Sequence, residues 1–237
     1  VVALLGIYEF YKLALLKNIQ PQFLNGLVFG GYLFVSISLY AHDVFSFGWV
    51  LLSLPVAIII PVTELFRKAG QPFTNIAYTI LGGLYVALPL ALLNFFFSPF
   101  ELRGGFNTHI LLGFFIITWV ADTAAYLVGS AMGKHKLFER ISPGKTWEGS
   151  AGSVVFGVVA AYIFSLIFKD IQFLHWAIIS VIIVVTGTLG DLAESMLKRS
   201  VDVKDSGTIM PGHGGILDRF DGVFFAAVFV FIYIYFF

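Results

Sequence analysis

The stretch that decides the fold runs from Phe173 to Gly190 and reads FLHWAIISVIIVVTGTLG. It contains no Lys, Arg, Asp or Glu. A helix of about 20 mainly apolar residues is long enough to cross a bilayer. Similar apolar blocks occupy residues 23–41, 46–66, 76–98, 109–131, 149–168 and 221–237, the quoted one extends over 173–197, and a partial one begins at Val1. The pattern predicts an all-α, polytopic integral membrane bundle of about eight transmembrane helices.

The composition agrees with a membrane protein and excludes several classes of function. Of the 237 residues, 59% are hydrophobic and 12% are charged, against about 25% charged in soluble domains. Fourteen Lys and Arg balance 14 Asp and Glu, so no basic excess is present to bind nucleic acid. The absence of cysteine excludes disulfides, Cys-ligated metals and a thiol nucleophile.

The distribution of Lys and Arg predicts the orientation, because cytoplasmic loops carry the excess of positive residues. Eight alternating spans place only Arg103 and Lys169 on one side and put the remaining twelve on the other: Lys12, Lys17, Arg67, Lys68, Lys134, Lys136, Arg140, Lys145, Lys198, Arg199, Lys204 and Arg219. We therefore expect one membrane domain over 1–237, with N-terminal helices in 1–108 and catalytic helices in 109–237, and with cytoplasmic loops at 132–148 and 198–220. Because Val1 lies inside an apolar run and is not Met, we also expect further residues upstream.

The charged residues concentrate between residues 191 and 221. Asp191 and Glu194 stand three apart at the end of one block, and Asp218 and Asp221 have the same spacing at the start of the next, so each pair shares a helix face. Carboxylates suit a hard cation such as Mg²⁺, which binds through one or two of them plus substrate phosphates. The interleaved Lys and Arg residues would neutralise phosphates. The region is typical of a site for a metal-bound polyphosphate, although a solvated connector, with Asp221 as a simple helix cap, is the alternative.

A second charged segment precedes the 149–168 block and contains Ser142-Pro-Gly-Lys145-Thr-Trp-Glu-Gly149. It is not a P-loop, because Glu139 stands where that motif needs its first glycine and a membrane helix is expected where it needs a preceding strand. It remains a weak candidate for phosphate binding through Lys145.

Two single residues are further candidates. Asp122 lies within an apolar run, where a carboxylate is costly and is either functional or a structural hydrogen-bonding acid. His213 lies between glycines and could be a loop hydrogen-bonding residue, a phosphate contact or a proton carrier.

The segment Ser195-Met-Leu-Lys198-Arg199-x4-Lys204-Asp205-Ser206-Gly207-x3-Pro211-Gly212-His213-Gly214-Gly215-Ile-Leu-Asp218-Arg219-Phe-Asp221 resembles the signature of the phosphatidate cytidylyltransferases, also called CDP-diacylglycerol synthases. Trp119-x-x-Asp122-Thr123, Gly133-Lys-His-Lys136 and Ser142–Gly149 also resemble that family. The resemblance covers roughly residues 115–225. The earlier residues match only as a run of membrane helices.

The resemblance implies a phospholipid-biosynthetic enzyme of the bacterial cytoplasmic membrane that transfers CMP from CTP to phosphatidic acid, giving CDP-diacylglycerol and pyrophosphate. It implies Mg²⁺, a second cation such as K⁺ in some members, and a homodimer. By similarity, the catalytic residues are Asp191, Asp218, Asp221, Lys198 and Arg219, of which the three aspartates are the metal ligands. The residues implied for substrate binding are Asp122, Lys145, Arg199, Lys204, Asp205 and His213.

Two other classes of function stay open on the sequence alone. A CTP-dependent lipid kinase uses the same nucleotide but transfers the γ-phosphoryl group to an alcohol. A cation channel or transporter would use Asp122, Asp191 and proline-kinked helices as an ion path.

Overall fold

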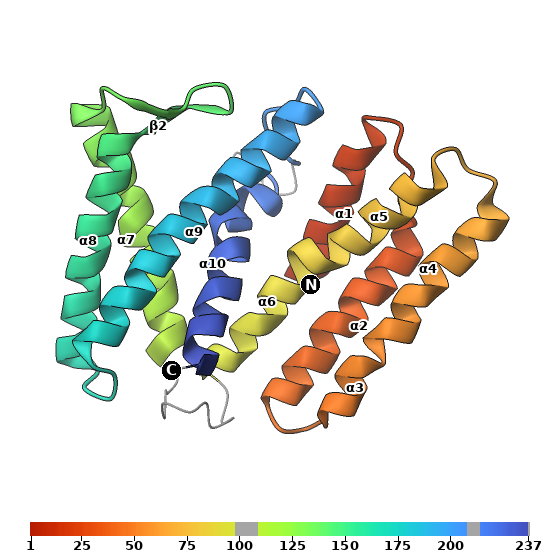
Figure 1. Cartoon of the computed structure of the whole chain (residues 1–237), viewed down its shortest axis with the longest axis horizontal. Coiled ribbons are helices and arrows are strands. Elements are labelled where there is room, and N and C mark those ends of the chain that lie inside the picture. Colours follow the sequence, from red (N-terminus) through yellow and green to blue (C-terminus); the bar gives the residue numbers. More distant parts are fainter. Residues whose placement is uncertain (98–108, 208–213, 237) are drawn as a thin grey trace. The chain divides into compact units, whose positions relative to one another are not determined.

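A computed structural model of the chain describes residues 1–97, 109–207 and 214–236. Its elements are α1 (Val2–Leu15), α2 (Phe23–Ala41), α3 (Phe47–Leu51), α4 (Ser53–Arg67), α5 (Pro72–Gly82), the π-helical turn η1 (Gly83–Ala87), α6 (Leu88–Leu92), the 3₁₀ turn η2 (Leu93–Phe97), α7 (His109–Met132), β1 (Lys136–Phe138), β2 (Ser142–Thr146), α8 (Trp147–Ile167), α9 (Phe173–Ser200) and α10 (Leu217–Phe236) (Figure 1). They form two compact units. The first unit is Val1–Phe95 with Leu197–Phe220, and the second unit is Phe96–Met196 with Asp221–Phe237.

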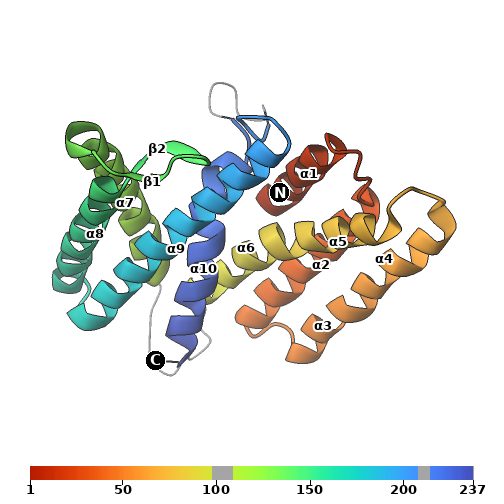
Figure 2. The ribbon, with the colours of Figure 1, turned by 45° about the horizontal axis from the view of Figure 1, so that its top comes forward.

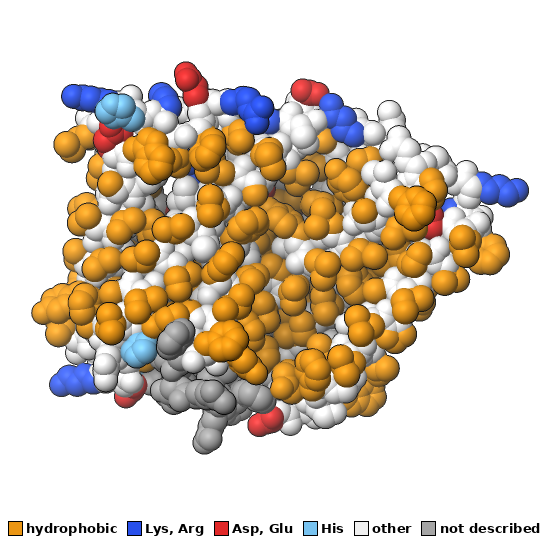
Figure 3. Space-filling view, in the orientation of Figure 1, with side chains coloured by type: hydrophobic (Ala, Val, Ile, Leu, Met, Phe, Trp, Pro, Cys, Tyr) orange, Lys and Arg blue, Asp and Glu red, His pale blue; other side chains and the backbone are white. Residues whose placement is uncertain are grey.

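The helices confirm the predicted membrane class. Seven segments of the described chain are long and apolar enough to cross a membrane: Phe23–Ala41, Phe47–Arg67, Pro72–Phe97, His109–Met132, Trp147–Ile167, Phe173–Ser200 and Leu217–Phe236. The remaining predicted block, the partial one that begins at Val1, corresponds to α1, which has 14 residues and is shorter than a transmembrane span. In each unit, hydrophobic side chains cover the sides of the helices and charged side chains lie mainly at helix ends (Figure 3). The chain is therefore an integral membrane protein with multiple helices.

Small residues allow the helices of the first unit to pack closely. A Cβ added to Gly30 would lie 3.4 Å from the Cα atom of Gly83, so the two backbones approach directly. Gly26 and Gly82 both lie against the buried ring of Tyr11, and a Cβ on either would overlap that ring.

The segment Pro72–Phe97 shows the irregularity expected from its proline. The π-helical turn η1 stands directly before α6, and Pro89 lies in the first turn of α6. Proline lacks the N–H group that would continue the helical hydrogen bonds, so the helix changes its winding at this point.

Glycines also mark the helix contacts of the second unit. Helices α7 and α8 lie side by side (Figures 1 and 2), and Gly149 comes within contact distance of the Cα atom of Gly129. A Cβ on Gly190 of α9 would lie 3.3 Å from the Cα atom of Gly222 of α10 and 2.5 Å from the carbonyl oxygen of Asp221. These glycines let the helices of the second unit approach one another closely.

The predicted cytoplasmic loop at 132–148 contains a short antiparallel hairpin, which the sequence did not indicate. Strands β1 and β2 pair Lys136 with Thr146 and Phe138 with Ser142. The hairpin is the one departure from all-α structure among the described residues, and it leads directly into α8.

Candidate functional site

The first unit holds a hydrogen-bonded group centred on the carboxylate of Asp218. Its Oδ1 accepts a hydrogen bond from Nζ of Lys198 at 2.6 Å. Its Oδ2 accepts from the backbone N–H of Ser206 at 2.9 Å, from the Ser206 hydroxyl at 2.9 Å and from the N–H of Gly215 at 2.7 Å. The Asp218 and Lys198 side chains are only 12% and 13% exposed. Four residues of the quoted signature are thus joined in one group.

Local sequence explains why these residues meet. Lys198 lies in the last turn of α9 and Asp218 in the first turn of α10, where the helix dipoles favour a cation and an anion respectively. Gly214 has φ +81°, a left-handed conformation that glycine adopts without strain, and a Cβ there would lie 2.8 Å from Oδ2 of Asp218. The glycine therefore lets the backbone turn tightly so that Gly215 can donate to the carboxylate.

The second unit holds a separate charged group on three elements. Lys145 of β2 forms an ion pair with Asp191 of α9, and their side chains are 24% and 36% exposed. The hydroxyl of Ser195 donates to Oδ1 of Asp191 at 3.2 Å. Lys145 and Asp191 are also the charged residues that act electrostatically on Asp122 of α7. Asp122, Lys145 and Asp191 therefore lie close enough to one another to interact.

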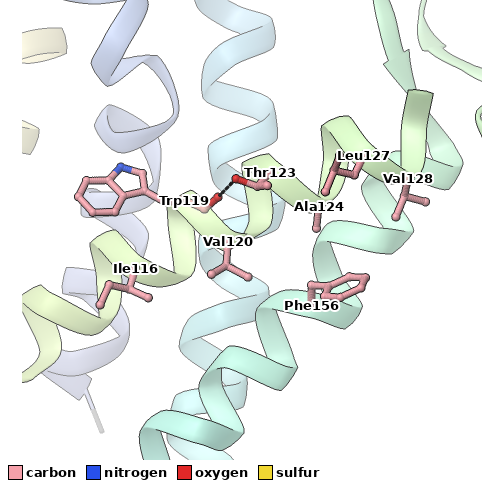
Figure 4. A pocket seen from close by; sticks show the side chains of 8 residues that line it. All are labelled: Ile116, Trp119, Val120, Thr123, Ala124, Leu127, Val128 and Phe156. Carbon is pink, nitrogen blue, oxygen red and sulfur yellow. Dashed lines mark hydrogen bonds between the residues drawn. The ribbon is translucent and has the colours of Figure 1, made fainter. Parts of the chain in front are cut away.

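A groove on α7 is distinct from this charged group. It has a volume of about 370 Å³, and the eight described residues that line it are uncharged, seven on α7 and Phe156 on α8 (Figure 4). Thr123 within it donates its hydroxyl to the carbonyl of Trp119 at 2.8 Å, so its polar atom is satisfied by the helix itself. The groove belongs to the apolar surface of the spans.

The other predicted site residues lie at or near the surface. Asp221 is partly exposed in α10, and its Oδ1 accepts from the N–H of Gly222 at 2.6 Å. Four further predicted site residues are exposed: Arg199, Lys204, Asp205 and Arg219. Arg199 donates to the carbonyl of Val203 at 3.3 Å. His213 lies outside the described residues.

The loop before α8 uses several of its donors within the protein. The Thr146 side chain caps α8 by accepting from the N–H of Gly149 at 3.1 Å. The carboxylate of Glu148 accepts from the N–H groups of Lys134 and His135 and contacts Nδ1 of His135 at 2.6 Å. Lys145 is the residue of this loop that joins the charged group of the second unit.

Sequence reasoning missed Glu9 in α1. Its side chain is 1% exposed, and its Oε2 accepts from the N–H of Leu217 at 3.0 Å and from the Ser206 hydroxyl at 3.4 Å. An acid inside an apolar helix is the same signal that singled out Asp122, so it could have been found by that rule.

The carboxylates are chemically suited to Mg²⁺. Asp191, Asp218 and Asp221 offer oxygen atoms only, as a hard cation prefers. Within the described ranges, no three Asp, Glu or His side chains converge as a metal-binding group. A hard cation at these carboxylates would take one or two of them and complete its shell with phosphate oxygens and water.

The membrane spans and a Lys–Asp pair in each unit together define a polytopic membrane protein with charged groups suited to phosphates. The family profile described as "Cytidylyltransferase family" matches residues 1–237. The chain belongs to this family and is thereby an enzyme of the nucleotidyltransferase class.

Curated relatives carry a more specific name. A phosphatidate cytidylyltransferase of Haemophilus influenzae is 35% identical over 259 residues, covering 100% of this chain and 88% of the relative. One of Bacillus subtilis is 39% identical over 183 residues, covering 77% and 64%. One of Staphylococcus saprophyticus is 41% identical over 162 residues, covering 68% and 56%. The matches to the Bacillus and Staphylococcus relatives thus span less than two thirds of those proteins' length.

Proposed function

We propose that the chain is a phosphatidate cytidylyltransferase, which transfers CMP from CTP to phosphatidic acid and releases CDP-diacylglycerol and pyrophosphate in phospholipid biosynthesis. The observation that carries this proposal is the group formed by Lys198, Ser206, Gly215 and Asp218 at the ends of two membrane helices. The name of the relatives supports the choice of substrates.

The reaction needs no covalent enzyme intermediate. A phosphate oxygen of phosphatidic acid attacks the α-phosphorus of CTP, a new P–O bond forms, and the bond to the oxygen that bridges the α- and β-phosphorus breaks as pyrophosphate leaves. The attacking oxygen is already ionised, so no dedicated general base is required. Catalysis then consists of bringing two anions together and neutralising their charge.

We assign the candidate residues to three roles: phosphate binding, Mg²⁺ binding and polar lining of the substrate cavity. We assign binding of phosphate oxygens to Lys145, Lys198, Arg199, Lys204 and Arg219. The residues that would hold Mg²⁺ are Asp191, Asp218 and Asp221, and the bound ion would neutralise phosphate charge. Polar lining of the substrate cavity is assigned to Asp122, Asp205 and His213.

The two Lys–Asp pairs also neutralise the carboxylates when no substrate is bound. Lys198 and Lys145 each neutralise one of the carboxylates, so neither Asp218 nor Asp191 is left unpaired. Removal of one partner from such a pair is costly in a poorly solvated place. On binding, the lysines would move from carboxylate to phosphate oxygens.

The distribution of Lys and Arg supports a site that faces the cytoplasm in a bacterial inner membrane. We further propose a homodimer and a second cation such as K⁺. Crosslinking in native membranes tests the dimer, and activity in K⁺ against Na⁺ tests the second cation.

The test of function is incorporation of label from cytidine-labelled CTP into lipid by the purified chain, with phosphatidic acid, with and without Mg²⁺. We expect Mg²⁺-dependent CDP-diacylglycerol and an equal amount of pyrophosphate. Label that reaches lipid only from [γ-³²P]CTP would show a lipid kinase instead, and ion flux in vesicles without CTP would show a transporter.

Two lysine variants sharpen this test. Lys198→Ala should raise the KM for CTP or phosphatidic acid, because it removes an ammonium group that we assign to phosphate oxygens. In the structure this group pairs with the carboxylate of Asp218. Lys169→Ala is the matched control, since Lys169 is exposed between α8 and α9 and lies on the opposite side in the predicted topology. An unchanged KM for both substrates in Lys198→Ala would contradict the phosphate-binding role.

A further inference from the structure

Glu9 is a buried acid that contacts the signature from outside it. It lies in α1, yet its Oε2 accepts from Leu217 and Ser206, which are 208 and 197 residues away in sequence. Its Oε1 accepts no hydrogen bond from the residues that the structure describes. A carboxylate with 1% exposure is costly to bury, so its position calls for a specific reason.

The contact with Leu217 gives that reason. The N–H groups of the first turn of a helix need acceptors, which a Ser, Thr, Asp or Asn just before the helix usually supplies. Ile216 stands before α10 and has no polar side-chain atom. Glu9 supplies the acceptor from another helix, and its negative charge also suits the positive end of the α10 dipole.

The signature glycines are shaped around the same carboxylate. A Cβ added to Gly207 would lie 2.6 Å from Oε1 of Glu9, and one added to Gly215 would lie 2.5 Å from its Oε2. Any side chain at either position would displace the carboxylate or the loop. Two glycines of the signature are thus explained by a residue of the first helix.

The contact with Ser206 connects Glu9 to Asp218. The Ser206 hydroxyl lies 3.4 Å from Oε2 of Glu9 and 2.9 Å from Oδ2 of Asp218, and Gly215 donates to the same Oδ2 atom. Movement of Glu9 would shift two of the three residues that hold the Asp218 carboxylate in place.

We infer that Glu9 is a positioning residue for the reaction: it caps α10 and fixes Ser206 and the backbone at Gly207 and at Gly215, and through them sets the orientation of Asp218. The inference rests on the proposed function, because Asp218 is the residue whose orientation the reaction uses.

The test compares Glu9→Gln with Glu64→Gln. Glu64 is a matched control: it is also a buried acid of the first unit at 5% exposure, but its partners are Gln22, Asn75 and Arg67 and not the signature. Three quantities are measured on the 237-residue chain in detergent: kcat, the KM for CTP, and hydrogen exchange of the peptide that contains Leu217.

We expect Glu9→Gln to lower kcat by about 10- to 100-fold, as for residues that orient a ligand-bearing side chain, with the KM for CTP within about twofold. Exchange at Leu217 should become faster, because the neutral amide caps α10 more weakly. Glu64→Gln should lower thermal stability and leave kcat per folded molecule and Leu217 exchange unchanged. Wild-type kcat in Glu9→Gln would overturn the inference.

Gly207→Ala gives a second route if Glu9→Gln does not fold. It keeps the acid but places a Cβ against Oε1, so it should reproduce the loss of kcat and the faster exchange. Wild-type values of both in Gly207→Ala would overturn the inference. If the wild-type chain itself transferred no CMP, the proposed function would fail, whereas unchanged Leu217 exchange in the Glu9 variant would refute the positioning role alone.

Discussion

Replacement of Asp218 by Asn tests the candidate site most directly. The change keeps the shape of the side chain but removes its charge and one of its two acceptor oxygens. Four donor contacts from Lys198, Ser206 and Gly215 converge on this carboxylate. The amide group cannot accept all of them, and its NH₂ must face either the lysine or the loop donors.

The size of the effect follows from burial. Lys198 and Asp218 are 13% and 12% exposed, so solvent screens their interaction weakly. Loss of one partner from a buried pair costs about 3–5 kcal/mol, because the other charge stays buried and unpaired. Lys198→Met should cost less, about 1–3 kcal/mol, because Ser206 and Gly215 still donate to the carboxylate. The double variant should be less destabilised than the sum of the two, since residues in direct contact are coupled.

Two assays measure these effects. Thermal unfolding in detergent should show a decrease on the order of 10 °C for Asp218→Asn, taking about 2–4 °C per kcal/mol for a chain of this size. Activity at saturating Mg²⁺, normalised to folded protein below the transition, should fall by at least about 100-fold.

Either assay can refute the reasoning. Wild-type turnover of Asp218→Asn at saturating Mg²⁺ would contradict the assignment of Asp218 as a metal ligand. An unchanged unfolding temperature in both Asp218→Asn and Lys198→Met would show that the pair contributes nothing to stability, and the argument from burial would then be wrong.

Three further predictions follow from single contacts. Gly215→Ala should abolish activity, because its Cβ would lie 2.3 Å from the Ser206 hydroxyl. Gly144→Ala is the control and should be tolerated, because no atom lies within 4 Å of a Cβ at that position. Equal turnover of the two variants would refute the argument from close packing. Lys145→Ala should raise the KM for CTP by about tenfold through loss of a charged contact, and an unchanged KM would limit Lys145 to pairing with Asp191. Thr146→Ala should lower stability by about 1 kcal/mol through loss of the α8 cap while kcat stays unchanged; a large fall in kcat would instead place Thr146 in the site.

The membrane spans were predictable because hydropathy depends on composition over about 20 residues and on nothing distant. The last block is an example: hydropathy places it at 221–237, and α10 covers Leu217–Phe236. The β1–β2 hairpin was not predictable in this way, because its strands have three and five residues and no alternating apolar pattern.

The residues of the candidate site also differ in whether local sequence could predict them. Asp218 and Lys198 were identified from their type and spacing, and the structure pairs them. Spacing gave no indication that Lys145 would meet Asp191, because the two belong to different elements. Glu9 could have been found as an acid in an apolar helix, but its partners lie about 200 residues away in sequence, and only tertiary packing shows what it contacts.

Within the second unit, α9 and α10 make a close contact beside Asp191. A Cβ added to Gly190 of α9 would lie 2.5 Å from the carbonyl oxygen of Asp221 in α10 and 3.3 Å from the Cα atom of Gly222. We expect Gly190→Ala to loosen this contact and to reduce turnover without removing any charged group, because Gly190 directly precedes Asp191. Wild-type turnover in a Gly190→Ala chain that unfolds at a lower temperature would show that this helix contact serves stability alone.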